Sequence, residues 1–137
     1  MPSPSSPRGG LHVSLWVVQA LLGLAFLGAG FMKLTTPVDQ LVANGMNWVT
    51  YTPEPLVRFI GLSELLGAIG LVAPSATRIQ PRLTALAALG LVVVMVLAAI
   101  THATHGEAAV VPVNVVLGGL AGFVAWGRGV KAPIPGR

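Results

Sequence analysis

One carboxylate stands in a stretch that is otherwise uncharged and strongly apolar. The segment RFIGLSELLGAIGLV covers residues 58–72, and Glu64 is the one charged residue between Arg58 and Arg78. An ionised carboxylate surrounded by hydrocarbon costs several kcal/mol unless it is paired, hydrated or protonated. We therefore predict that Glu64 binds a ligand, moves a proton or acts in catalysis. A buried ion pair that holds the helix register is the alternative.

Four other polar residues lie at or near the ends of apolar segments. They are Lys33, His102, His105 and Asn114. A lysine at such a position can extend to the membrane interface, and an asparagine can form a hydrogen bond between two helices. A histidine can act as the proton partner of a carboxylate. Each residue thus has a functional interpretation and a structural one, as a helix anchor, an interhelical contact or an ordinary loop residue.

The segment HATHGE, residues 102–107, raises the question of a metal site. Its two histidines and its glutamate are residue types that bind zinc, and a single histidine can bind haem. The motif is short, however, and no further ligand pattern accompanies it. We predict no metal site here and leave the cofactor unassigned.

The composition indicates a membrane protein. The chain has 137 residues, enough for one domain, of which 54% are hydrophobic and only 9% are charged. About a quarter of the residues are charged in a typical soluble domain. The absence of cysteine excludes thiol redox catalysis, disulfides and cysteine-ligated metals. The net charge of +4 does not indicate nucleic acid, because the basic residues are scattered at the ends of apolar segments.

The elements that must position these residues are four apolar runs of membrane length. Helices are expected at about residues 15–34, 56–73, 83–104 and 109–126. Turn-rich segments separate them, so the chain is predicted to be an all-α integral membrane four-helix bundle. Residues 1–14 are Pro/Ser/Gly-rich and predict a disordered tail, and residues 129–137 form a C-terminal tail. The first run lacks a convincing cleavage site, so we expect a retained helix and not a signal peptide.

Charge predicts the orientation of the bundle. The basic residues that share a side with both termini are Arg8, Arg78, Arg82, Arg128, Lys131 and Arg137. The opposite side carries Asp39, Glu54 and Glu107, with Lys33 and Arg58 at helix ends. By the positive-inside rule both termini are expected to be cytoplasmic, in a bacterial-type inner membrane.

This topology brings the polar residues into one leaflet. Lys33, Glu64, His102, His105 and Asn114 come from different helices, yet all fall in the outer half of the membrane or at its outer rim. Such convergence predicts a polar pocket that opens outward. The long loop at residues 35–55 contains Trp48 and Tyr51, whose rings suit the membrane interface; it is either a short interfacial helix or a lid over the bundle.

The motifs resemble those of the DoxX-like membrane proteins. They are GLAFLGAGFMKL at the end of the first helix, GLSELLGAIGLV in the second, the histidine at the end of the third and VNVVLGGLAGFVAWGR in the fourth. The resemblance spans about residues 15–128. It implies a compact four-helix bundle and points to Lys33, Glu64, His102 and Asn114.

The family takes its name from a subunit associated with thiosulfate:quinone oxidoreductase. Other relatives are linked to redox partners or to membrane-protein assembly. The absence of cysteine separates this chain from thiol-dependent membrane proteins of similar architecture.

Two functions compete on these grounds. In the first, a small lipophilic molecule or quinone enters the outer half of the bundle, Glu64 acts as acid or base with His102 as proton partner, and Asn114 orients the ligand. Lys33, Trp48, Tyr51 and His105 complete the predicted ligand-binding set. Isomerisation, hydration or quinone-linked proton transfer would fit such a site.

In the second, the chain is a non-catalytic accessory or assembly subunit of a membrane redox complex. Gly- and Ala-rich faces of the second and fourth helices would then dock a membrane-protein partner or a second copy of the chain. Proton-coupled transport is less favoured, because four helices form a transporter only by oligomerising and no clear inverted repeat is present. In either case the lipid bilayer is the expected surrounding and nucleic acid is not.

Overall fold

The computed structural model describes residues 7–137, and every regular element in this part of the chain is helical. The four long helices are α1 (Pro7–Thr35), α3 (Glu54–Thr77), α4 (Arg82–Thr104) and α5 (Val111–Trp126). The shorter helical segments are α2 (Val38–Ala43), η1 (Asn47–Tyr51), η2 (Ala108–Val110) and η3 (Gly127–Lys131). Each long helix belongs to a segment that is long and apolar enough to cross a membrane. The predicted all-α membrane bundle of four helices is therefore confirmed.

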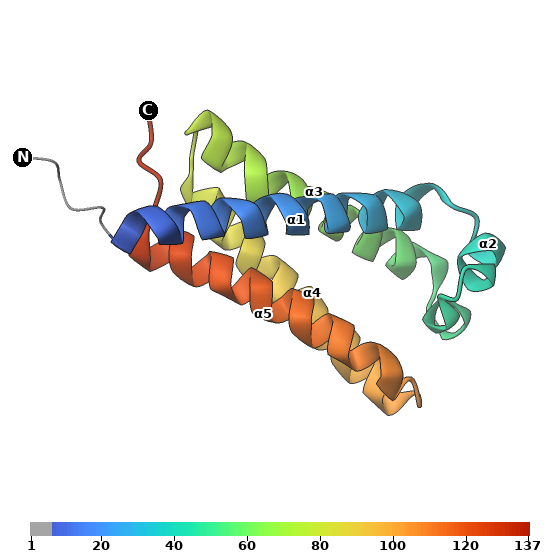
Figure 1. The fold of residues 1–137 in the computed structure, drawn as a ribbon. Coiled ribbons are helices and arrows are strands. Elements are labelled where there is room, and N and C mark those ends of the chain that lie inside the picture. Colours follow the sequence, from blue (N-terminus) through green and yellow to red (C-terminus); the bar gives the residue numbers. More distant parts are fainter. Residues whose placement is uncertain (1–6) are drawn as a thin grey trace, which may run out of the picture.

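The long helices form two pairs. α1 packs chiefly against α3, and α4 packs chiefly against α5. The pairs lie together at the end that holds both termini and diverge toward the other end, where α2 and η1 lie (Figure 1). We call these the termini end and the cap end, and we call residues 36–53, which join α1 to α3, the cap.

The helix surfaces show why this chain needs lipid. The buried core is small and apolar, formed by Leu15, Leu22 and Phe26 of α1 with residues such as Leu71 and Leu91 of the other helices. Large apolar side chains also cover the outside of all four long helices; Leu24, for example, is 70% exposed. A soluble protein rarely exposes so much continuous apolar surface. In a bilayer the same surface is solvated by acyl chains.

Glycines set the closest helix contacts. A Cβ atom on Gly30 of α1 would lie 2.6 Å from the carbonyl oxygen of Gly61 on α3, and one on Gly61 would lie 2.8 Å from the Cβ of Lys33. Glycine is therefore required on both sides of this contact, where the two backbones touch. One turn from this contact on each helix lie Lys33 and Glu64.

The helix ends differ from those expected. α1 begins at Pro7, so the tail predicted over residues 1–14 is wrong from Pro7 onward, while residues 1–6 lie outside the described part. Proline is well tolerated in a first helical turn, and Leu11 packs against the core, so this turn has a reason to form. At the other end, η3 makes part of the predicted C-terminal tail helical as far as Lys131.

Candidate functional site

Glu64 forms a buried ion pair with Lys33. The Lys33 Nζ lies 2.5 Å from the Glu64 Oε1, and the two side chains are 14% and 2% exposed respectively. The contact of Gly30 with Gly61 holds α1 and α3 close enough for these side chains to meet. The sequence predicted a partner or ligand for Glu64 without identifying it; the structure identifies a partner within the chain.

The Arg58 side chain caps the C-terminal end of α1 next to the Lys33–Glu64 pair. Its Nη1 donates to the carbonyl oxygens of Lys33 (2.8 Å) and Thr36 (2.7 Å), and its Nη2 lies 3.0 Å from the Glu54 carboxylate. The last carbonyls of a helix have no partner within the helix, and a guanidinium is well suited to satisfy them. Arg58 therefore anchors the chain position from which Lys33 extends.

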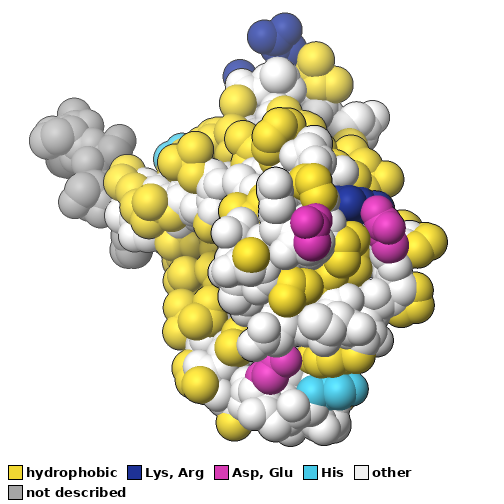
Figure 2. All heavy atoms as spheres, turned by 90° about the vertical axis from the view of Figure 1, so that its right-hand side faces the viewer, with side chains coloured by type: hydrophobic (Ala, Val, Ile, Leu, Met, Phe, Trp, Pro, Cys, Tyr) yellow, Lys and Arg dark blue, Asp and Glu magenta, His cyan; other side chains and the backbone are white. Residues whose placement is uncertain are grey.

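The cap lies against the exposed side of the pair. Leu41 and Val49 of the cap pack with Val57 of α3 into a small apolar cluster of their own. The Lys33 Nζ lies 5.7 Å from the centre of the Trp48 ring, within the range of a cation–π contact. Trp48 is thus one of the side chains that shield the ion pair, and Figure 2 looks onto this end of the molecule.

A second polar cluster joins the cap to the connection between α4 and α5. We call its four members, Tyr51, His102, His105 and Glu107, the latch. The His102 Nδ1 lies 2.6 Å from the Glu107 Oε2, and the Tyr51 hydroxyl donates to the Glu107 Oε1 at 3.3 Å. The Tyr51 ring stacks on His105 with the ring centres 4.1 Å apart. The latch therefore ties the cap to the helix pair from which α1 and α3 diverge.

The contact of Tyr51 with Glu107 is expected to make the stability of the cap depend on pH. The pKa of Tyr51 is raised above its ordinary value of 10.0, first because burial disfavours the phenolate and then because Glu107 repels it. The folded chain thus holds this proton more tightly than the unfolded chain does. The stability that arises from this shift of Tyr51 is present below pH 10.0 and is lost as the pH rises through the raised pKa.

Ultraviolet absorbance of the phenolate measures this titration, because Tyr51 is the only tyrosine in the chain. We expect the Glu107→Gln variant to titrate closer to the ordinary value, because the repelling charge is gone. An identical titration in the two proteins would show that Glu107 does not act on the phenol.

Asn114 contributes an unsatisfied buried group. Its residue is 7% exposed, and its Nδ2 has no hydrogen-bond partner within the described part of the chain. It lies one helical turn before Gly118, which contacts Met95 of α4, so it belongs to the α4–α5 pair. A buried donor without a partner costs about 1–3 kcal/mol. Within the described residues the Asn114 Nδ2 therefore does not make the predicted interhelical hydrogen bond. A hydrogen-bond acceptor on a ligand would satisfy this nitrogen.

The predicted site residues thus fall into separate groups. Lys33, Glu64 and Trp48 lie together on the α1–α3 side, whereas Tyr51, His102 and His105 meet Glu107 in the latch. His102 makes its hydrogen bond with Glu107, and no hydrogen bond joins it to Glu64 in the described residues. The sequence analysis considered Glu107 as a possible metal ligand and as an acidic residue that orients the bundle, and not as a partner of His102, although a separation of five residues allows contact across a tight turn. Among residues 7–137, no group of three or more His, Cys, Asp or Glu side chains is placed to hold a metal ion.

Sequence reasoning assigned no role to a polar network at the termini end. The Gln19 side chain donates to the Leu71 carbonyl oxygen at 2.6 Å and accepts from the Arg128 Nε at 2.7 Å. The hydroxyls of Ser75 and Thr84 are 2.7 Å apart, and Ser75 also contacts Gln19. Gln19 is the one amide in an apolar helix, a signal that could have been followed, but its partners are distant in the sequence.

Comparison with known proteins supports the membrane assignment. A family model described as the DoxX-like family matches residues 17–124, a range that takes in most or all of each of the four long helices. No curated protein and no solved structure matches the chain. The matched range is well over half of the sequence and contains Lys33, Glu64, His102 and Asn114. This helical membrane protein therefore belongs to the DoxX-like family.

Proposed function

We propose that the protein binds a small lipophilic molecule, such as a quinone, at the cap end, with Lys33 and Glu64 as its polar contacts. The observation that carries this proposal is the buried ion pair, in which Glu64 is 2% exposed. A buried ion pair adds little net stability compared with apolar residues of the same volume. A pair kept at membrane depth is therefore better explained by a role in binding or proton transfer.

The chemistry of the pair suits a ligand with a carbonyl or hydroxyl oxygen. The Lys33 ammonium can donate to a carbonyl oxygen, and the Glu64 carboxylate can accept the proton of a hydroxyl. Isomerisation that moves only protons needs an acid and a base of this kind, and hydration needs the same two groups together with a water molecule that adds to the substrate. Quinone-linked chemistry would also need electrons from a redox partner, and the pair would supply its protons.

The position of the cap implies how a ligand would reach the pair. Trp48 shields Lys33, and Glu64 is almost completely buried, so the cap has to move for a ligand to enter. The two helix pairs diverge toward this end (Figure 1), and we expect a ligand that displaces the cap to approach the ion pair from the side of α4 and α5. The free amide of Asn114 and the imidazole of His102 belong to that side, where they would contact the same ligand.

The glycines weigh against the alternative function of an accessory subunit. That hypothesis needs the Gly- and Ala-rich faces of α3 and α5 as docking surfaces. Gly61 instead packs against α1, while Gly67 and Gly70 would place a Cβ within 2.8 Å of side chains on α4. Gly118 likewise contacts Met95 of α4. These glycines contact other helices of the bundle, so most of the predicted docking face is not available to a partner.

Native mass spectrometry of protein extracted gently from its host's membranes tests the proposal. We expect a small molecule to remain bound to the wild type and to be held much more weakly by Glu64→Gln, because a neutral amide oxygen is a weaker hydrogen-bond acceptor than a carboxylate and is not a base. Glu54→Gln is the matched control, since Glu54 starts the same helix but is 61% exposed and lies against Arg58. Equal retention by all three proteins would show that Glu64 does not hold the ligand.

The direction of the bundle in the membrane belongs to the same proposal. Arg78, Arg82, Arg128 and Lys131 lie at the termini end, whereas Asp39, Glu54 and Glu107 lie at the cap end. By the positive-inside rule the termini would face the cytoplasm of a bacterial-type inner membrane. The ligand would then enter from the outer leaflet.

A further inference from the structure

A crevice of about 660 Å³ lies at the termini end, away from the ion pair. Its walls come from the first turns of α1, the end of α3 and the segment that follows η3. His12, Trp16, Arg78 and Lys131 are among the residues that line it, together with an apolar strip from Ala132 to Pro135. The crevice thus combines cations with an apolar wall at the place where the membrane-spanning helices end.

Behind this crevice lies a cation with no acidic partner. Arg128 is 3% exposed, and its hydrogen bonds go to the Gln19 Oε1, the His12 Nδ1 and carbonyl oxygen, and the Ala132 carbonyl oxygen. All of these acceptors are neutral. The four acidic residues of the chain are Asp39, Glu54, Glu64 and Glu107. Each belongs to the cap end or to the Lys33 pair, so the buried charge is not neutralised by any acidic side chain of the chain.

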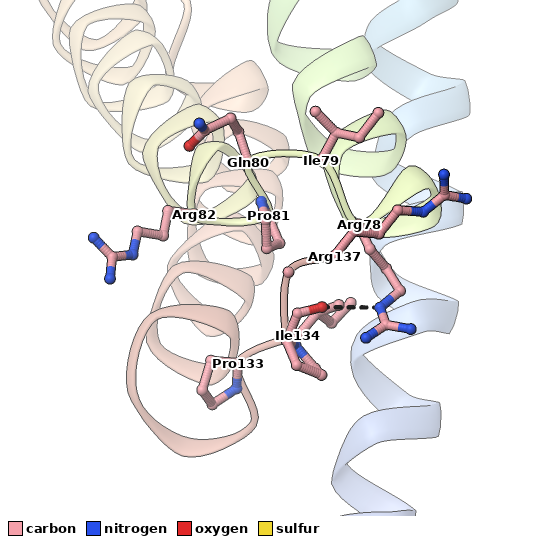
Figure 3. A pocket seen from close by; sticks show the side chains of 10 residues that line it. Arg78, Ile79, Gln80, Pro81, Arg82, Pro133, Ile134 and Arg137 are labelled. Atoms are coloured by element: carbon pink, nitrogen blue, oxygen red, sulfur yellow. Dashed lines mark hydrogen bonds between the residues drawn. The ribbon is translucent and has the colours of Figure 1, made fainter.

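Three of the side chains that line the crevice, His12, Arg78 and Lys131, carry hydrogen-bond donors. The Arg128 guanidinium can only donate, so the His12 Nδ1 must accept and the ring proton resides on Nε2. The Arg78 Nε donates to the Pro135 carbonyl oxygen at 2.9 Å, a bond that Figure 3 shows from the side of the neighbouring pocket lined by Arg82 and Arg137. The Arg78 carbonyl oxygen accepts from the Arg137 amide at 3.0 Å. These bonds hold Arg78 beside the C-terminal segment. The two terminal nitrogens of Arg78 make no hydrogen bond within the described residues.

We propose that this crevice binds a phosphate group, supplied by an anionic lipid headgroup or by a soluble phosphate ester. Arg78, Lys131 and the His12 Nε2–H would donate to its oxygens, and Arg128 would add positive potential from behind. Basic pockets at the ends of membrane helices are suited to phospholipid headgroups. The apolar wall of Trp16, Pro133 and Ile134 would accommodate the carbon chain attached to the phosphate.

Lys131 and Arg82 provide a matched pair of variants. Both are exposed cations at the termini end, but Lys131 lines the crevice, whereas Arg82 lines a neighbouring pocket that shares Arg78 and residues 133–135 with it. Figure 3 shows Arg82 pointing away from Arg78. Neither side chain makes a hydrogen bond or salt bridge within the described part of the chain, so Lys131→Gln and Arg82→Gln each remove one charge and leave the packing intact.

The experiment measures binding of defined probes to purified protein in detergent by native mass spectrometry. The probes are phosphatidylglycerol, phosphatidylcholine and, in a separate arm, inorganic phosphate as competitor. We expect one phosphatidylglycerol to bind in preference to phosphatidylcholine. Lys131→Gln should weaken this binding about fivefold, the effect of one cation near a membrane surface, and Arg82→Gln should leave it unchanged.

The outcomes separate the possible sources of the phosphate. Selective lipid binding that Lys131→Gln weakens and inorganic phosphate does not displace supports a lipid headgroup site. Displacement by inorganic phosphate at low concentration, with no preference between the lipids, supports a soluble phosphate ester. An equal loss of phosphatidylglycerol binding in Lys131→Gln and Arg82→Gln would overturn the proposal, because it would show that binding depends on the total positive charge of the termini end and not on the crevice. Absence of binding by every probe would also overturn it.

Discussion

Replacing Lys33 with methionine is expected to lower the free energy of unfolding by about 3–5 kcal/mol, as found when one partner of a buried ion pair is removed. The reason is the position of Glu64, whose side chain is 2% exposed and whose Oε1 has the Lys33 ammonium as its partner at 2.5 Å. Without that ammonium the carboxylate is left uncompensated in an apolar surrounding. Unfolding in mixed detergent micelles, followed by circular dichroism, measures the loss.

Glu64→Gln should cost less than Lys33→Met, because the amide oxygen still accepts a hydrogen bond and Lys33 is long enough to reach the interface. The double variant Lys33→Met/Glu64→Leu should recover most of the loss, since apolar residues replace a buried pair at little or no cost. A loss below about 1 kcal/mol in Lys33→Met would contradict this account, because it falls in the range of exposed pairs.

The double variant also separates the two interpretations of Glu64. If the pair binds a ligand, the double variant folds but retains no small molecule. If the pair only locks the register of α1 and α3, the double variant folds and retains whatever the wild type retains. Stability and ligand retention are thus measured on the same protein.

The second large effect is expected at Gly30. In Gly30→Ala the new methyl group would lie 2.6 Å from two backbone atoms of α3, the Gly61 oxygen and the Leu65 nitrogen. Backbone atoms cannot rotate away, so α1 and α3 have to separate. We expect a loss of about 3 kcal/mol, the upper end of the usual cost of overpacking, together with a longer distance between Lys33 and Glu64.

Gly28 is the matched control on the same helix. A Cβ at Gly28 meets nothing within 4 Å, so Gly28→Ala changes helix propensity alone. That change should stabilise the protein by up to about 1 kcal/mol, the opposite sign from Gly30→Ala. Destabilisation of the same size in both variants would mean that general crowding of α1, and not the contact with Gly61, limits stability.

The sequence predicted the fold class because that prediction depends only on local properties. Four runs of apolar residues are each long enough to span the hydrocarbon, and backbone groups in lipid must be satisfied within a helix. Glu64 could be singled out for the same reason, since a carboxylate within such a run is costly wherever its neighbours lie. Neither argument requires the helices to be arranged in any particular way.

The partners of these residues could not be predicted. Lipid is as apolar as a protein core, so hydrophobicity alone does not show which residue of a neighbouring helix each side of α1 or α3 contacts. The contact between Gly30 and Gly61 is one of the tertiary contacts that set the rotation bringing Lys33 onto Glu64. The expected proton partner, His102, instead bonds Glu107, because a tight turn brings that carboxylate back over the end of α4.

The sequence by itself determined that this chain crosses a membrane four times as helices and that one acid within it must be paired, hydrated or protonated. The tertiary structure decided what pairs that acid, how Trp48 shields the pair, and that Arg128 is buried against Gln19. The division has a physical cause. Transfer into lipid is a property of each segment, whereas an ion pair depends on contacts between backbones that lie far apart in the sequence.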